Sequence, residues 1–133
     1  MRLWPLAILD QLPRQQLLGQ HRECCALRGK GWGRKHATVD YVFKYGLAKL
    51  YSYHVMVMAE MARRGYAVGS LWSQRTYRGK SLPRADFDEV GIHWYMGGPI
   101  YPEHDEKYLA ECVENLARKG VTIDVKKIVG GVL

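Results

Sequence analysis

The residues best suited to chemistry in this chain are His21, Arg22 and Glu23, which follow one another inside a basic part of the sequence. A carboxylate among cations is what an enzyme needs when it must hold an acid–base group beside a phosphate backbone. The other interpretation is a surface glutamate that pairs with a neighbouring arginine and contributes little to stability. The spacing of these three residues leaves both interpretations open.

Charge is distributed unevenly along the 133 residues, whose formal net charge is +7. Between residues 14 and 80 there are 13 Lys and Arg against three acidic residues, a local balance of +10. Such a basic block predicts a polyanionic partner, most often nucleic acid, although a solubilising surface has the same composition. Hydrophobic residues make up 47% and charged residues 25%, which excludes intrinsic disorder and favours one folded domain over residues 1–133.

Three stretches have the apolar spacing of amphipathic helices: residues 11–28, 47–64 and 103–119. Pro13 suits the start of the first helix, and Gly65 and Gly120 follow the other two, where helices commonly end. Residues 29–44 and 68–98 are rich in Gly, Arg and aromatic residues and predict irregular connections, with room for one short helix in the second. We therefore expect a mainly α fold, a compact single domain of about three principal helices with long irregular connections.

Within the first predicted helix, Glu23 is expected to lie away from the packed side. An advance of about 100° per residue puts Glu23 roughly 200° from His21, which belongs to the apolar stripe. Gly19 and Ala26 lie about one turn from Glu23 and are small, so a bulky ligand can approach the carboxylate. The adjacent cysteines of this helix are expected to pack in the core.

Four segments carry a resemblance to a known family: Met1-Arg2-Leu3-Trp4, Leu17-Leu18-Gly19-Gln20-His21-Arg22-Glu23, Arg34-Lys35-His36 and Ala59-Glu60-Met61-Ala62-Arg63-Arg64-Gly65-Tyr66. They resemble the pyrimidine dimer DNA glycosylases, the family typified by phage endonuclease V. Trp94-Tyr95 and Ile100-Tyr101 are similar, more loosely, to an aromatic segment of that family. Both 59–65 and 110–120 resemble the same family helix, so one of the two is additional here.

The resemblance implies a small, mostly helical enzyme that needs no metal or organic cofactor. In the family the α-amine of the amino-terminal residue forms a Schiff base with the sugar at the damaged base, a glutamate on the first helix assists, and elimination then cuts the strand. By this resemblance the catalytic residues are Met1 and Glu23. The residues expected to contact damaged double-stranded DNA are Arg2, His21, Arg22, Arg34, Lys35, His36, Trp94 and Tyr95.

An α-amine suits this chemistry because its reference pKa is about 7.7 to 8.0, against about 10.4 for lysine. A useful fraction is therefore neutral and nucleophilic at neutral pH, and nearby cations favour the neutral form further. We expect the bulky Arg2 to prevent removal of Met1. Met1 and Ala26 depart from the phage pattern, which has a small first residue and an arginine near the glutamate, so the identity of the lesion stays open.

Two other functions remain open at this point: a glycosylase for another modified base, and a non-catalytic nucleic-acid-binding module on the same scaffold. The five histidines lack the spacing of metal ligands, so we expect no metal site. Trp32, Trp72 and Trp94 lie in Gly- or Arg-rich stretches, where they either insert between bases or cover a small core.

The expected compartment follows from the cysteines and from the first residues. Three cysteines, two of them adjacent, do not make a disulfide framework, which favours a reducing environment. The short apolar run at the amino terminus is broken by Pro5 and Asp10, so it predicts neither a signal peptide nor a membrane span. We expect a cytoplasmic, nucleoid-associated protein that makes no membrane contact, with a monomer favoured.

Overall fold

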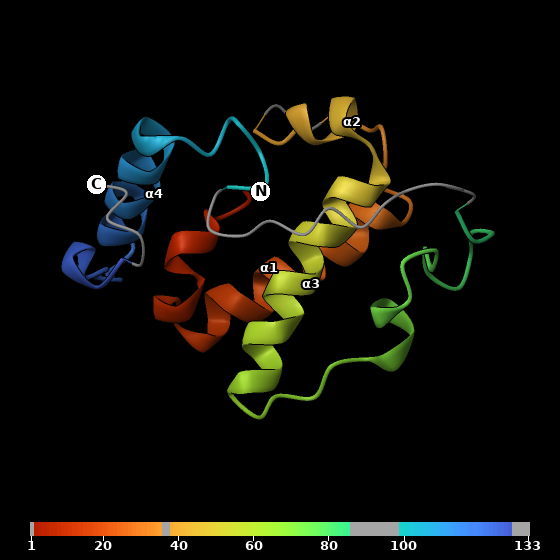
Figure 1. The fold of residues 1–133 in the computed structure, drawn as a ribbon, viewed down its shortest axis with the longest axis horizontal. Coiled ribbons are helices and arrows are strands. Elements are labelled where there is room, and N and C mark those ends of the chain that lie inside the picture. The colour runs from red at the N-terminus through yellow and green to blue at the C-terminus, as the bar shows by residue number, and fades with distance from the viewer. Residues whose placement is uncertain (1, 36–37, 86–98, 129–133) are drawn as a thin grey trace.

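The computed structural model describes residues 2–35, 38–85 and 99–128, and no strand occurs within these ranges. The elements, shown in Figure 1, are η1 (Leu6–Gln11), α1 (Arg14–Arg28), α2 (Tyr41–Tyr45), α3 (Leu47–Arg63), η2 (Ser70–Ser73), α4 (Glu106–Arg118) and η3 (Val125–Lys127), where η marks a 3-10 helix. The prediction of a mainly α fold with three principal helices is confirmed. In the described part of the chain, no helix has both the length and the apolar character needed to cross a membrane.

The three long helices form close to their predicted bounds. α1 begins at Arg14 because Pro13 separates it from η1, which ends at Gln11, the first residue of the predicted helix. α4 begins at Glu106, where the side chain of Asp105 accepts a hydrogen bond from the Tyr108 N–H and caps the helix. α2 was not predicted, since five residues are too few to show a helical period. The short helix allowed for residues 86–93 lies outside the described residues.

α3 and α4 end in the same way, which explains why their last residues look alike in the sequence. Gly65 and Gly120 follow these helices with φ of 82° and 84°. In each case the N–H of the residue after the glycine donates to a carbonyl oxygen five positions earlier, at 2.9 and 2.8 Å. Glycine adopts this left-handed conformation without the steric cost that other residues incur. The last residues of α3 and α4 therefore look alike because both are helix ends, which Gly65 and Gly120 already indicated in the sequence.

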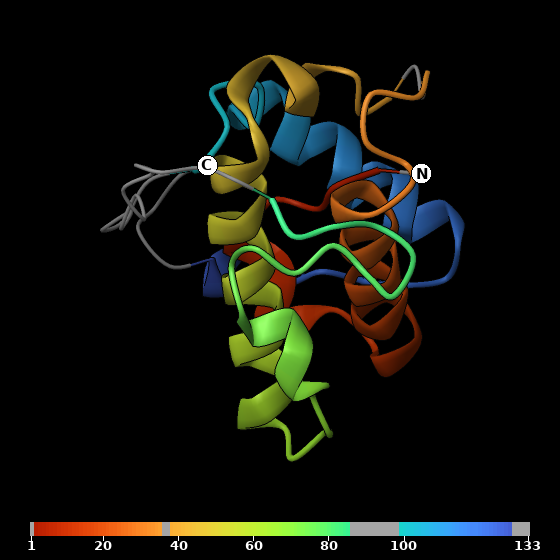
Figure 2. The same cartoon turned by 90° about the vertical axis from the view of Figure 1, so that its right-hand side faces the viewer.

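One hydrophobic core joins the start of the chain to the three long helices. α1 and α3 lie side by side, and the two views in Figures 1 and 2 agree on this arrangement. α4 packs on the other side of the first residues of the chain. The fully buried side chains of this core include Leu3, Ile8, Leu12, Leu17, Leu27, Leu50, Leu109 and Leu116. α1 is consequently covered on more than one side.

Arg28, the last residue of α1, is buried and organises the segment that follows α3. Its guanidinium donates to the carbonyl oxygens of Trp72, Gln74 and Tyr77 at 2.8, 2.8 and 3.1 Å. It also donates to Nδ1 of His54 on α3 at 2.9 Å. Because a buried cation is costly unless it is hydrogen-bonded, these four acceptors fix both the side chain and residues 72–77.

Replacing Arg28 is expected to destabilise the protein strongly. Arg28→Ala leaves three carbonyl oxygens without their donor, and a buried group that loses its partner costs about 1–3 kcal/mol. We expect the free energy of unfolding in urea to fall by at least about 3 kcal/mol. The control is Arg34→Ala at an exposed position, which should change it by no more than about 0.5 kcal/mol. Equal effects of the two substitutions would contradict the role given to Arg28.

Candidate active site

The amino-terminal segment, residues 2–5, is held against α1 by the side chain of Gln20. Gln20 Nε2 donates to the Arg2 carbonyl oxygen at 3.1 Å, and Gln20 Oε1 accepts from the Trp4 N–H at 2.6 Å. Gln20 is buried. A single amide thus satisfies the backbone of two residues that are neither helical nor part of a sheet.

Two tyrosines from other helices also form hydrogen bonds to the backbone of this segment. The hydroxyl of Tyr53, on α3, donates to the Trp4 carbonyl oxygen. The hydroxyl of Tyr108, on α4, donates to the Leu3 carbonyl oxygen at 2.7 Å. Side chains from α1, α3 and α4 therefore fix three consecutive residues, which places the start of the chain firmly relative to all three helices.

Glu23 lies beside this segment and shares its hydrogen bonds. Its Oε2 accepts from Gln20 Nε2 at 3.1 Å, and its carboxylate also accepts from the backbone N–H of Arg2. Burial raises the pKa of the Glu23 carboxyl above its usual value, although the amino-terminal charge, the Arg2 N–H and Lys119 act in the opposite direction. A raised pKa increases the protonated fraction of a carboxyl group at any given pH, and the protonated form is the one that can give a proton.

A cavity of about 280 Å³ opens next to this carboxylate. We call it the Glu23 cavity, and its lining residues are Arg2, Trp4, Glu23, Thr38, Asn115 and Lys119. They come from the amino-terminal segment, α1, the connection before α2, and α4. Two cations around one carboxyl are suited to a negatively charged substrate whose reaction needs proton transfer.

The expectation that Glu23 faces away from the packed side needs correction. Ala26 is exposed as expected, but Leu27 on the same flank is fully buried and Glu23 is half-buried. The reason is that the amino-terminal segment and α4 cover this flank of α1. A ligand therefore reaches Glu23 through the cavity rather than across an open helix face.

His21 is absent from the lining of the Glu23 cavity and instead meets His54 of α3. Arg28 is always a donor, so His54 Nδ1 accepts from it and the His54 proton resides on Nε2. His54 Nε2 lies 2.8 Å from His21 Nδ1, which must then be the acceptor. The sequence positions of His21 and His54 gave no sign of this contact. The two hydrogen bonds run in one direction, from Arg28 to His54 and from His54 to His21.

Cys25 completes a group of three possible metal ligands, because its Sγ and the ring nitrogens of His21 and His54 lie within 4.8 Å of one another. A metal on His54 Nε2 would displace the proton there, while Nδ1 faces a guanidinium that cannot accept one. Metal-bound histidine instead donates from its second nitrogen. Burial also raises the pKa of the Cys25 thiol to about 11. The donor set therefore suits a hydrogen-bonded packing group better than a metal ion.

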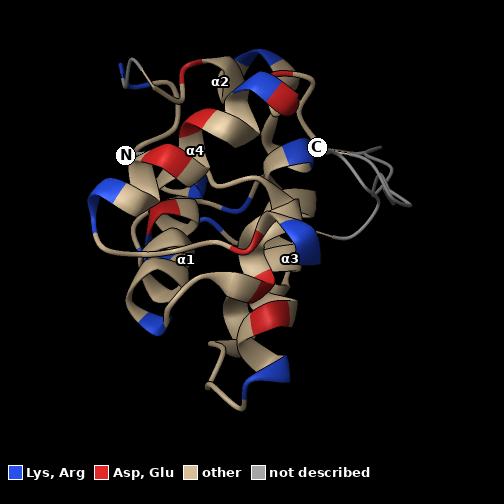
Figure 3. Cartoon of the chain, turned by 90° about the vertical axis from the view of Figure 1, so that its left-hand side faces the viewer, with Lys and Arg blue, Asp and Glu red and all other residues tan. Residues whose placement is uncertain are grey.

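The other residues predicted to contact DNA are partly described. Arg22, Arg34 and Lys35 are exposed, and Arg2 lines the Glu23 cavity. Four predicted site residues lie outside the described residues: Met1, His36, Trp94 and Tyr95. On the face shown in Figure 3, acidic and basic residues are mixed along α4 and α3.

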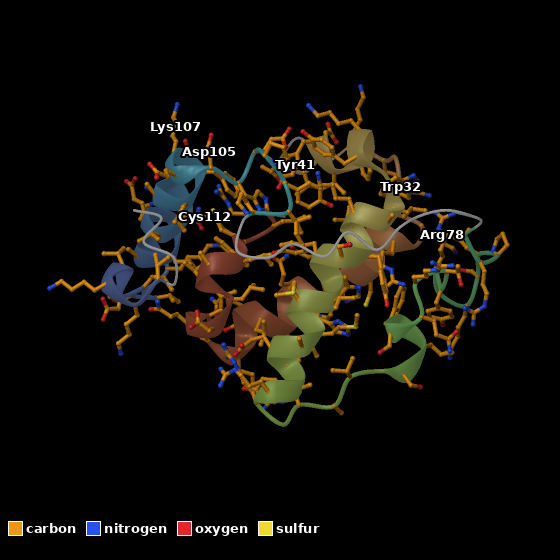
Figure 4. The ribbon with its side chains drawn as sticks, viewed as in Figure 1. Trp32, Tyr41, Arg78, Asp105, Lys107 and Cys112 are labelled. Carbon is orange, nitrogen blue, oxygen red and sulfur yellow. The ribbon has the colours of Figure 1, made fainter. Side chains whose placement is uncertain are left out.

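Two of the three tryptophans considered as DNA wedges pack within the protein. Trp32, labelled in Figure 4, makes an edge-on contact with Phe43, with ring centroids 4.9 Å apart. Trp72 packs against Tyr77 at 4.8 Å. Both are half-buried, which supports the core-covering interpretation for these two. Trp94 lies outside the described residues.

The model of the pyrimidine dimer DNA glycosylase family matches residues 1–74, more than half of the 133 residues. The chain belongs to this family. The resemblance stated from the sequence is thereby confirmed, and the protein is a DNA repair glycosylase with DNA as its substrate. No curated protein and no solved structure matches the chain.

The family match divides the site of this glycosylase into two parts. The amino-terminal segment, Gln20, Glu23 and Tyr53 lie within residues 1–74, whereas α4 lies beyond them. Sequence analysis missed Gln20, although it stands three positions before Glu23 and therefore on the same helix face. It also missed the α4 residues of the cavity, because their helix was judged by its apolar stripe alone.

Gln20 should be essential to the stability of this glycosylase. Gln20→Leu leaves the Arg2 carbonyl and the Trp4 N–H without partners in a buried place. At about 1–3 kcal/mol for each such group, we expect the free energy of unfolding in urea to fall by about 2–5 kcal/mol. Gln15→Leu is the matched control, since Gln15 is exposed on the same helix. Gln15→Leu should lie within about 0.5 kcal/mol of the parent, and a similar value for Gln20→Leu would refute the proposed hold.

The burial of His54 predicts that the protein loses stability in acid. Burial, with the nearby Arg28 charge, lowers the pKa of His54 to about 2, whereas an unfolded histidine titrates near about 6.5. As pH falls below about 6.5, His54 binds a proton in the unfolded chain but stays neutral in the folded chain. The free energy of unfolding should therefore decrease by up to about 1.4 kcal/mol per pH unit from this group.

The measurement is urea unfolding at pH 7, 6 and 5, on the parent and on His54→Gln. Glutamine offers Arg28 an oxygen acceptor and does not titrate. In His54→Gln the free energy of unfolding should therefore fall less steeply with decreasing pH, by the amount that corresponds to about one proton. Parallel slopes for the two proteins would contradict a neutral His54 in the fold.

Proposed function

We propose that this protein is a DNA glycosylase with associated abasic-site lyase activity on damaged duplex DNA. Its nucleophile is the α-amine of Met1, and Glu23 is the carboxyl group that moves protons. The observation that supports the proposal is the Gln20 amide, whose Nε2 donates to the Arg2 carbonyl oxygen and to Glu23 Oε2, each at 3.1 Å. Because a single peptide bond joins Arg2 to the residue that carries the amine, this shared donor supports pairing that amine with the Glu23 carboxyl group.

The reaction begins with attack of the neutral amine on C1′ of the damaged nucleotide. The nitrogen–C1′ bond forms, and the bond from C1′ to the base breaks, so that the base leaves with its electron pair and takes up a proton. The C1′–O4′ bond then opens, O4′ gains a proton, and the nitrogen lone pair completes the iminium. Glu23 in its protonated form supplies a proton in this stage, as its raised pKa favours.

Strand cleavage follows from the iminium, which acidifies the neighbouring C2′. The Glu23 carboxylate removes a C2′ proton, and the electrons released expel the 3′ phosphate as the C3′–O bond breaks. Water then hydrolyses the imine and restores the amine. No step changes the overall oxidation state, so the sequence needs only proton transfer.

Glu23→Gln tests the role of the carboxyl group. An amide keeps the size of the side chain but cannot exchange protons, and general acid–base catalysis contributes about 10²- to 10⁴-fold. We expect single-turnover cleavage of the glycosidic bond in a thymine-dimer duplex to slow by at least about 10²-fold, with duplex affinity little changed. Glu114→Gln, on the exposed side of α4, is the control and should keep the parent rate. A Glu23→Gln variant that cleaves the glycosidic bond at the parent rate would exclude Glu23 as the proton carrier.

Blocking the amine distinguishes catalysis from binding alone. A protein acetylated at Met1 has no free lone pair for attack, so borohydride should trap no covalent adduct on abasic duplex, while affinity for the duplex persists. Parent protein under the same conditions should give the adduct. If the parent also forms none on any lesion tested, a binding module on this scaffold becomes the better account. Adducts confined to other lesions would indicate a glycosylase for another modified base.

A further inference from the structure

One side of α4 contacts the amino-terminal segment. Its residues are Tyr108, Cys112 and Asn115, and Lys119 follows directly after the helix. The four are spaced four, three and four positions apart, which aligns them on one side. The first two hold the segment: Tyr108 donates to the Leu3 carbonyl oxygen, and Cys112 Sγ accepts from Arg2 Nη1 at 3.5 Å. Figure 4 shows Cys112 on the inner side of α4.

The other two residues of this face line the Glu23 cavity. Asn115 Oδ1 is buried and has no hydrogen-bond partner within the part of the chain that the structure describes. Nearly all buried side-chain oxygens in proteins are paired, and an exception requires an explanation. An unpaired acceptor on a residue that lines a cavity is suited to an N–H group of a ligand.

Lys119 stands at the solvent end of the same face. Its side chain is exposed, and Nζ lies 5.5 Å from the centre of the Trp4 ring, which forms another wall of the cavity. The four acidic residues at the start and along α4, Asp105, Glu106, Glu111 and Glu114, are all absent from the cavity lining. The helix therefore presents a cation and a neutral amide to the cavity and keeps its negative charge elsewhere.

We propose that Asn115 and Lys119 determine which nucleotide the Glu23 cavity accepts. Asn115 accepts a hydrogen bond from an N–H of the damaged base, and Lys119 holds a flanking phosphate. Enzymes that act on a base commonly take it into a pocket and contact its hydrogen-bonding edge. The inference rests on the proposed function, and it assigns selection of the base to a helix beyond the family match while the reacting groups lie inside it.

Asn115→Ala tests the contact to the base by comparing two duplexes. One carries a thymine dimer, whose bases retain N–H groups, and the other carries a tetrahydrofuran abasic analogue, which has no base at that position. We expect Asn115→Ala to reduce affinity for the dimer duplex about tenfold to a hundredfold and to leave abasic affinity within about twofold. Asn115→Asp, which keeps an acceptor at the same position, should recover part of the loss.

Lys119→Ala should weaken binding to both duplexes alike, because a phosphate is present in each. The salt dependence of log K should become shallower by about 0.9, the value for one phosphate contact. Lys107→Ala is the matched control on the same helix, since Figure 4 shows Lys107 pointing away from the rest of the protein. It should leave the salt slope unchanged.

The outcomes separate this inference from the proposed function. An unchanged dimer-to-abasic affinity ratio in Asn115→Ala, while the parent releases base and forms the borohydride adduct, overturns the inference alone. A changed ratio in a protein whose parent forms no adduct overturns the proposed chemistry and upholds Asn115 as the contact to the base. Equal salt slopes for Lys119→Ala and the parent overturn the phosphate contact.

Discussion

The candidate site depends on one buried amide. Both ends of the Gln20 side chain are used, since Nε2 donates to Arg2 and to Glu23 while Oε1 accepts from Trp4. An extended segment has no helical partners for its own backbone, and buried backbone groups must be paired. The segment can therefore lie in the core only where this amide meets it, and the same amide orients the carboxyl group. One side chain therefore contacts both the amino-terminal segment and Glu23.

Features that depend on local spacing could be predicted from the sequence. The apolar period located α1, α3 and α4, and Pro13, Gly65 and Gly120 marked where helices begin or end. The carboxylate of Glu23 was found because a charged motif within a basic block is itself local. The family resemblance is also local, since its most specific segments fall inside residues 1–74.

Contacts between distant parts of the chain could not be predicted in this way. Tyr108 and Leu3 are 105 positions apart, and His21 and His54 are 33 apart, so no spacing rule connects them. The same limitation explains the mistaken expectation for Glu23, because a helical wheel does not reveal that another helix covers the flank. Tertiary packing, rather than helical periodicity, decides what surrounds the carboxyl group.

The hydrogen bond between Tyr108 and Leu3 also bears on how the protein is made. Chains are synthesised from the amino terminus at about 5–20 residues per second, so Gln20 and Glu23 emerge early. The helix that closes the cavity is made near the end of synthesis, and long-range contacts form only after the intervening chain exists. The nascent chain thus carries Glu23 before it carries α4, and the Glu23 cavity is complete only when that last long helix docks.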